Sequence, residues 1–119
     1  MQSEFKIDYD LEEDLLFLYD ENRKSQGSVE FGDLIVDLER EGKICGLELF
    51  EASKYLTDLT GRKIGREDLE KIQKAKISII EKKGTTIIKM ILIIEQEAIP
   101  ASIAIQNIHY KSPILAKAK

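Results

Sequence analysis

Apolar and polar residues alternate along much of the first fifty residues, which is the period expected of a β-strand with one buried face. Phe5, Ile7 and Tyr9 are separated by charged residues, and this alternation predicts a strand over residues 5–10. A run that is apolar on both faces predicts a second strand at residues 15–19. Two further strands are predicted at residues 29–39, with a bend at Gly32-Asp33, and at residues 44–50. Gly42, which is free to take positive φ, predicts a hairpin turn before the last of them.

The second half of the chain begins with two segments of helical spacing and ends with strands. The pattern predicts helices at residues 51–59 and 66–74, followed by strands at residues 75–81, 85–95 and 101–108. Pro100 has no backbone N–H, so we expect it to precede the last strand rather than lie within it. Four strands, two short helices and three strands predict one α+β domain over residues 1–119, built mainly on an antiparallel β-sheet of about seven strands.

The strand predicted at residues 85–95 is apolar on both of its faces. A strand of this kind is usually covered on both sides, by helices or by another subunit. We therefore expect an interface patch on the C-terminal strands, made of Ile91, Ile93, Ile103 and Ile105. The alternative is that the same four side chains form the intramolecular core.

Charge is distributed unevenly along the chain. The formal net charge is −4, but residues 1–60 carry a net −10 and residues 61–119 a net +6. Two halves of opposite charge can attract each other within one chain, or two copies can associate head to tail. The basic half can also offer a surface to an acidic partner.

Composition narrows the class of protein. The chain is 43% hydrophobic and 34% charged, and it has neither an apolar stretch of about 20 residues nor the apolar core of a signal peptide. A single cysteine, Cys45, cannot form an internal disulfide. We therefore expect a cytoplasmic protein with no membrane association. Asparagine occurs only at Asn22 and Asn107, and Glu and Lys dominate the charges, which is typical of proteins from thermophiles.

Two groups of acidic residues are candidates for metal binding or acid–base chemistry. The first is the turn at residues 8–14, which lacks the Gly and Glu that a calcium loop needs at its sixth and twelfth positions. A solvated turn is the better interpretation. The second group is Asp37, Glu39 and Glu48 on adjacent strands, which Arg40 and Lys43 are close enough to neutralise. We expect an exposed charged sheet face there.

The remaining candidates carry weaker signals. Cys45 has a potential partner only in His109, and the pair would lack two of the four usual zinc ligands, so we expect a small buried residue. The basic stretch at residues 62–83 contains no aromatic residue for stacking on bases and is interrupted by acidic residues, which makes nucleic-acid binding unlikely. The sequence therefore predicts no catalytic, metal-binding or cofactor-binding residue.

Four segments resemble a known family. They are Phe5-Lys-Ile-Asp-Tyr-Asp10, Leu15-Leu-Phe-Leu-Tyr19, Leu34-Ile-Val-Asp-Leu-Glu39 and Gly42-Lys-Ile-Cys-Gly-Leu-Glu-Leu-Phe-Glu-Ala-Ser-Lys54. Together they resemble the domain of unknown function 2283 family over residues 5–56, although Leu11 stands where that family often has Pro. The resemblance implies a small β-rich fold and no assigned reaction, and it leaves residues 61–119 as a helix and three-strand extension.

These observations favour a non-enzymatic protein-interaction domain that associates with itself, most simply as a dimer. Two other functions are open: a nucleic-acid-associated accessory protein that uses the basic stretch at residues 62–83, and a small metal-dependent hydrolase that uses the acidic turn at residues 8–14. No cofactor is expected.

Overall fold

The computed structural model describes residues 2–106, and they form eight strands and two helices. The strands are β1 (Gln2–Asp10), β2 (Leu15–Tyr19), β3 (Gly27–Phe31), β4 (Leu34–Leu38), β5 (Ile44–Leu49), β6 (Ile72–Lys82), β7 (Thr85–Ile94) and β8 (Glu97–Gln106). The helices, α1 (Ala52–Thr60) and α2 (Arg66–Leu69), lie between β5 and β6. The predicted class, α+β with a mainly antiparallel sheet, is confirmed.

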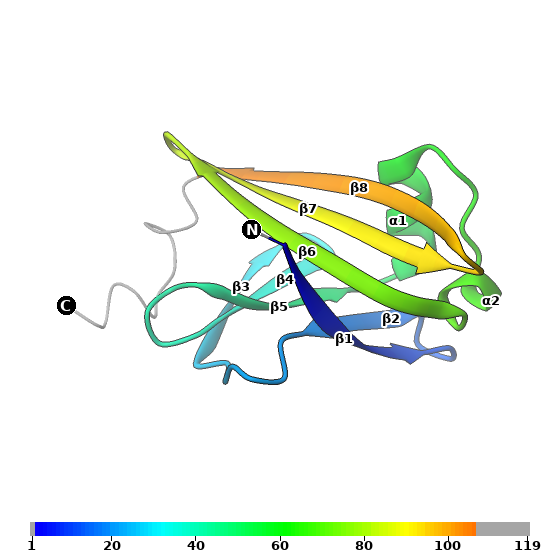
Figure 1. Cartoon of the computed structure of the whole chain (residues 1–119), viewed down its shortest axis with the longest axis horizontal. Helices are drawn as coiled ribbons and strands as arrows, with labels where there is room; N and C mark the ends of the chain where they lie inside the picture. The colour runs from blue at the N-terminus through cyan, green and yellow to red at the C-terminus, as the bar shows by residue number, and fades with distance from the viewer. Residues whose placement is uncertain (1, 107–119) are drawn as a thin grey trace.

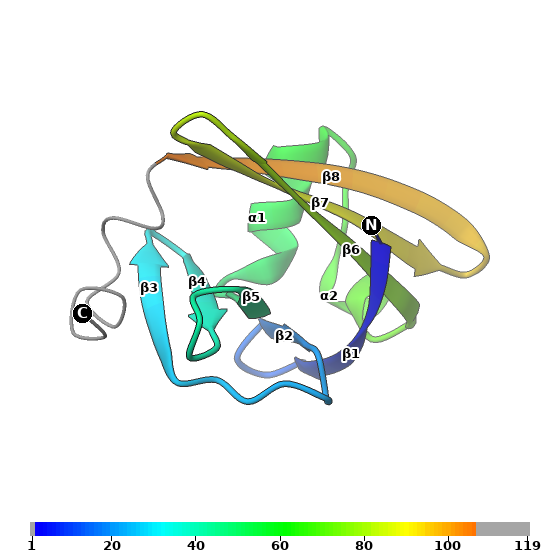
Figure 2. The same cartoon turned by 60° about the vertical axis from the view of Figure 1, so that its left-hand side comes forward.

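All eight strands belong to one ladder, in the order β3-β4-β5-β2-β1-β6-β7-β8, and every neighbouring pair is antiparallel. Strand β1 joins the two halves of the ladder, because its N-terminal part pairs with β6 and its C-terminal part pairs with β2. The ladder bends at this strand, so that β6–β8 lie across β2–β5, with α1 beside them (Figures 1 and 2).

The strand predicted at residues 29–39 is wrong in one respect, because it is two strands. Phe31 pairs directly with Leu34, so Gly32 and Asp33 form a tight hairpin turn between β3 and β4. Gly32 has a φ of 64°, a left-handed conformation that glycine adopts without the penalty of a Cβ atom. The expected bend at this dipeptide is therefore a complete reversal, and the sheet has eight strands rather than about seven.

Two other boundaries differ from the prediction. Helix α2 ends at Leu69 rather than near residue 74, and β6 already begins at Ile72 with a shift in register against β7. Pro100 lies inside β8, opposite Ile91, although we expected it to precede the strand. A proline is tolerated there because β8 is the edge of the ladder, where one side of the strand has no partner to receive an N–H.

The inner faces of both halves of the ladder form one hydrophobic core. Leu16, Leu18 and Leu47 from the N-terminal half are buried in the same cluster as Ile88 and Met90 from the C-terminal half. Helix α1 closes one side of this core with Ala52 and Leu56, and it packs against β8. Residues 61–106 therefore pack on the first sheet as well as extending it through β1.

Asp14 anchors helix α1 to the β1–β2 hairpin. Its backbone carbonyl accepts from the N–H of Ala52 at 2.9 Å, and its carboxylate accepts from the N–H of Ser53 at 3.1 Å and from Ser53 Oγ at 2.6 Å. The hydroxyl of Tyr9 donates to the same carboxylate at 2.6 Å. Helix α1 has no capping side chain of its own, so Asp14 takes that role from a distant strand turn.

This network shifts two pKa values. Burial acts to raise the pKa of Asp14, but the hydrogen bonds from Ser53 and Tyr9 and the charge of Arg66 outweigh it and lower that pKa. Burial and the neighbouring carboxylate raise the pKa of Tyr9. Asp14 is only 4% exposed, so the expectation of a fully solvated acidic turn is wrong at this residue, although Asp8 and Asp10 are exposed.

We predict that Asp14→Ala destabilises the protein by about 2–4 kcal/mol, because it removes a helix cap and leaves the partly buried hydroxyl of Tyr9 without its acceptor. Urea unfolding followed by circular dichroism measures the effect. Asp8→Ala, which removes an exposed carboxylate from the same strand, is the matched control and should stay within about 0.5 kcal/mol of the wild type. Equal stabilities for the two variants would contradict this role of Asp14.

Candidate functional site

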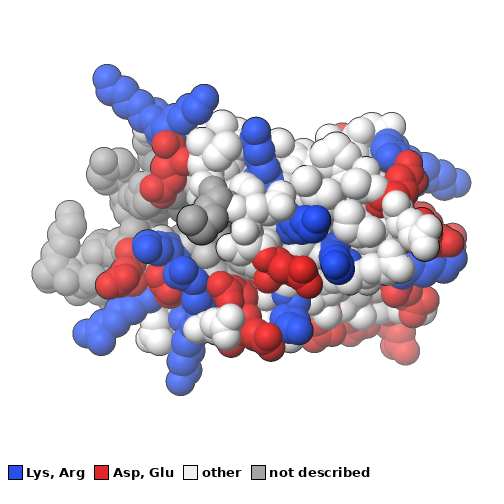
Figure 3. All heavy atoms as spheres, viewed as in Figure 1, with Lys and Arg blue, Asp and Glu red and all other residues white. Residues whose placement is uncertain are grey.

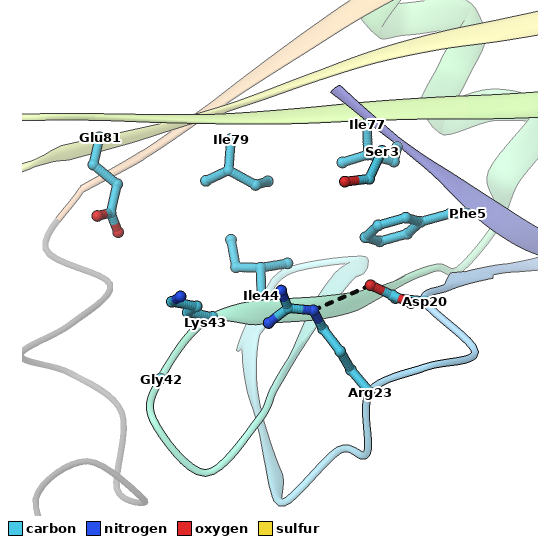
Figure 4. Close-up of a pocket in the computed structure, with 10 residues that line it drawn as sticks. All are labelled: Ser3, Phe5, Asp20, Arg23, Gly42, Lys43, Ile44, Ile77, Ile79 and Glu81. Carbon is cyan, nitrogen blue, oxygen red and sulfur yellow. Dashed lines mark hydrogen bonds and ion pairs between the residues drawn. The ribbon is translucent and has the colours of Figure 1, made fainter. Parts of the chain in front are cut away.

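The bent ladder has a cavity between its halves and two outward faces, and a function can be built on each of these surfaces. The cavity has a volume of about 410 Å³ and lies between β1 and β6 on one side and β5 with its neighbouring loops on the other (Figure 4). Phe5, Ile44, Ile77 and Ile79 give it an apolar lining. This volume lies within the range of small-molecule sites.

The charged residues that line this cavity are Asp20, Arg23, Lys43 and Glu81. Arg23 is held by two carboxylates, Asp20 at 3.1 Å and Glu39 at 2.9 Å. Glu39, predicted to be neutralised by Arg40 or Lys43, is therefore paired with Arg23. The cavity lining contains no cysteine or histidine, and Ser3 is its only hydroxyl group, so its described residues form no nucleophile–base pair.

The outward face of β1–β5 is acidic and partly apolar. Side chains alternate along each strand, and the inner positions are buried, which places Asp8, Asp10 and Glu30 outward together with Asp37 and Glu48. Phe17 and Tyr19 also lie on this face, with their ring centroids 4.9 Å apart. We call this surface the acidic face and define it by these seven residues and by their neighbours Leu15 and Ile35.

Asp37 and Glu48 form the tightest carboxylate pair on the acidic face. Asp37 is 4% exposed and accepts a hydrogen bond from Ser28 Oγ at 2.6 Å. Burial, a hydrogen bond to Asp37 and repulsion by its charge raise the pKa of Glu48 to about 7. The expectation of a fully exposed charged face is therefore wrong at this pair, because Asp37 is buried and the pKa of Glu48 is raised toward neutral pH.

Gly46 makes room for this pair. It lies opposite Asp37 in the ladder, and a Cβ atom at this position would be 2.9 Å from Asp37 Oδ2 and 3.3 Å from Phe17 Cε1. The absence of a side chain thus lets the Asp37 carboxylate lie over the neighbouring strand. The sequence alone does not identify Asp37 as the side chain that occupies this space.

Cys45 is buried, as expected, at a register shift between β4 and β5. Burial and the nearby carboxylate of Asp37 raise the pKa of its thiol to about 11, so the thiol is protonated near neutral pH and is a poor nucleophile. Its potential partner, His109, lies outside the described residues. Within residues 2–106 no group of three or more His, Cys, Asp or Glu side chains has an arrangement that could hold a metal ion.

Some cations of the basic stretch at residues 62–83 have partners within the chain. Arg62 pairs with Glu97 at 2.7 Å, and Lys71 pairs with Glu95 at 3.4 Å. Arg66 donates to the backbone carbonyls of Leu11 and Glu12 at 2.9 and 3.0 Å. The lysines of β6, by contrast, extend from the sheet.

The outward face of β6–β8 is apolar and basic. Alternation along the strands places Ile80, Ile87, Ile91 and Ile93 outward, interspersed with Lys74, Lys76, Lys82 and Lys89. Strand β8 contributes only small or uncharged side chains to this face, among them Ala98, Pro100 and Ser102. We call this surface the basic face. Figure 3, in the view of Figure 1, shows uncharged areas with separate basic side chains, and an acidic group beside some of them near the centre of the view.

The four residues predicted as an interface do not share one side of the sheet. Ile91 and Ile93 are partly buried on the basic face, whereas Ile103 and Ile105 point inward and are 8% and 4% exposed. Sequence reasoning did not include Ile80 and Ile87 in the patch, although they pair with each other across β6 and β7. Their positions on alternate residues of adjacent strands were the signal that could have identified them.

We predict that the pKa of Glu48 makes stability depend on pH. The folded pKa, about 7, is above the unfolded value near 4.5, so the folded state binds more protons between these values and the free energy of unfolding falls as pH rises from about 4.5 to 7. Glu48→Gln, which keeps a donor toward Asp37, should remove this loss. At pH 8 it should exceed the wild type by about 1–2 kcal/mol, discounted for partial exposure.

Urea unfolding at pH 5 and pH 8 checks this prediction, with Glu30→Gln, an exposed carboxylate of the same face, as the matched control. The wild type and Glu30→Gln should both lose stability between the two pH values, and Glu48→Gln should not. An identical pH dependence in all three proteins would contradict the raised pKa of Glu48.

Two known proteins are similar to this chain in sequence. An uncharacterised protein of Methanocaldococcus jannaschii is 36% identical over 78 residues, which cover 62% of this chain and 67% of the relative. A putative hypoxanthine phosphoribosyltransferase of Methanosarcina mazei is 30% identical over 87 residues, 71% of this chain and 66% of the relative. The matches thus span about two thirds of each relative.

No solved structure matches this chain. Among the described residues, no helix has the length and apolar character needed to cross a membrane. The family model of the protein of unknown function DUF2283 matches residues 6–53, the region that holds both Asp14 and the Asp37–Glu48 pair. With this match and that to the Methanocaldococcus protein, the chain belongs to the DUF2283 family.

Proposed function

We propose that this protein is a non-enzymatic interaction domain that associates with further copies of itself, and that the basic face takes part in the contact. The observation that carries the proposal is the position of Ile80, Ile87, Ile91 and Ile93 on the outward side of three long strands. No described element lies over that side of the sheet (Figures 1 and 2). Apolar strand surface of this kind is usually covered in the functional protein.

The size of the face is compatible with a weak specific contact. Ten-residue strands are about 34 Å long, and three strands about 4.8 Å apart are about 14 Å wide, so two such faces bury roughly 1,000 Å² together. That area is at the lower end of specific interfaces. We therefore expect reversible association that depends on protein concentration rather than a permanent oligomer.

The face of the sheet is a better candidate for the contact than its edge. Strand β8 ends the ladder at one side, and an exposed edge can pair with a second chain. Pro100 lies in the middle of that strand and has no N–H to donate, so it interrupts any continuous pairing of two β8 edges. The open face carries no such obstacle.

The other two functions are supported less well by the contacts of their residues. In the acidic turn at residues 8–14, the Asp14 carboxylate is occupied by Ser53 and Tyr9, and Asp10 accepts from the backbone of the turn. In the basic stretch at residues 62–83, the arginines are already bound within the chain, and the described part of the basic face offers no aromatic ring for base stacking.

The name of the Methanosarcina relative suggests a phosphoribosyltransferase. Such an activity would require a site for phosphate groups, and the only glycine-rich basic segment of this chain is Gly61 to Gly65. Gly61 ends helix α1, and the N–H of Gly65 donates to Asp68 at 2.8 Å. Since these groups already have partners, we do not extend that activity to this chain.

We predict that Ile91→Glu shifts the protein toward the monomer without unfolding it, because it places a charge in the centre of the apolar contact. Native mass spectrometry and light scattering across a concentration series measure the oligomer, and circular dichroism checks the fold. Leu11→Glu changes an exposed apolar residue of the β1–β2 turn in the same way and is the matched control. A wild-type protein that stays monomeric at 0.5 mM would contradict the proposed function.

A further inference from the structure

Resting on the proposed self-association, we infer that its contact is head to tail: the basic face of one copy docks on the acidic face of the next. The occupant of each face is thus a second copy of this chain, and the two contacting surfaces are different. The placement of acidic and basic side chains on different faces of the fold supports this inference. The sequence shows only that the first half of the chain is acidic and the second half is basic.

The basic face presents four lysines and no carboxylate along the outward positions of β6–β8. Lys89 is at its centre, and its cross-strand neighbours are Ser78 and Ser102. A symmetric dimer that packs two basic faces together would bring these lysines toward lysines of the partner. Like charges across a contact oppose association, so this face favours an acidic partner surface.

The acidic face has the complementary composition. Asp8, Asp10 and Glu30 are exposed on it, and Glu48 lies among them. Lys6 is also outward on β1, beside Tyr19, and it pairs with Glu21 at 3.7 Å, so the face keeps an excess of carboxylates. Apolar area is also available, because Phe17 and Tyr19 are stacked on each other and only partly buried. Lysine side chains can lie along such rings with their stems while their ammonium groups reach the carboxylates.

The two faces have little opportunity to neutralise each other within one chain. Their inner sides share a single core, so their outer sides point away from each other. Packed sheets are about 10 Å apart, and outward side chains add to this separation, which makes it larger than the Debye length of about 8 Å at physiological salt. The faces approach only at β1, where Glu4 is opposite Lys76.

A head-to-tail contact determines how many copies of the chain can assemble. A contact between two different surfaces leaves one face of each kind free at the ends, so association continues until a ring closes or the concentration limits it. We expect species larger than the dimer to accumulate as the protein concentration rises, and to dissociate as salt screens the charges. A symmetric contact through one face would stop at two copies.

Charge-reversal variants that are tested alone and mixed distinguish these arrangements. The first variant, Lys74→Glu with Lys89→Glu, leaves two lysines and two glutamates on its β6–β8 face and keeps its acidic face. The second, Asp8→Lys with Glu30→Lys, places two lysines on its acidic face and keeps its basic face. All four positions are exposed, so the fold should tolerate the changes. Each variant alone should associate about 100-fold more weakly than the wild type, and an equimolar mixture should regain association.

The measurements are sedimentation velocity and native mass spectrometry, in which the variants are told apart by mass. Hetero-oligomers of the mixture, with both variants monomeric alone, support the head-to-tail contact. If the acidic-face variant associates like the wild type, the inference is overturned while the proposed self-association stands. If the wild type itself is monomeric, the proposed function has failed first, so the two failures are distinguishable.

Discussion

The fold depends on one strand, β1, which pairs with both halves of the ladder. The N-terminal part of β1 pairs with β6 and its C-terminal part with β2, so a single antiparallel ladder bends there and closes over its own apolar side. Without this strand, the halves of the chain would be two small sheets, each with one uncovered core face. With it, both inner faces are buried in one cluster and both outer faces point away from that cluster.

Two polar networks stabilise this arrangement from the region shared with the family. Asp14 fixes helix α1 to the β1–β2 hairpin through Ser53, and Asp37 packs over Gly46 beside Glu48. Both networks contain carboxylates of the type found in active sites, yet each carboxylate has partners that explain it without a substrate. A buried or perturbed acidic residue is a candidate for catalysis only after its structural contacts have been counted.

The sequence predicted the fold class and most strands, because alternation is a local signal that survives in the folded chain. It did not separate β3 from β4, since a two-residue turn at Gly32 and a bend at Gly32 have the same local composition. It also could not tell that Ile103 points inward and Ile91 outward, because both positions are apolar and only the layer packed beneath the strand decides which face is buried. Ser53, through which Asp14 holds helix α1, is 39 residues from Asp14 in the chain, a distance at which periodicity carries no information.

The charge distribution is a further feature that the sequence predicts only in part. The opposite net charges of the two halves were visible in the sequence, but the choice between attraction within a chain and attraction between chains depends on which way the side chains point. The fold turns both sets outward on separate faces, and this favours attraction between chains.

Sedimentation velocity of the unmodified protein, at two concentrations and at low and high salt, tests this account most directly. The account predicts that the weight-average sedimentation coefficient rises with concentration at low salt and returns toward the monomer value at about 0.5 M salt, where the Debye length is only a few ångströms. A coefficient that stays at the monomer value under all four conditions would contradict it.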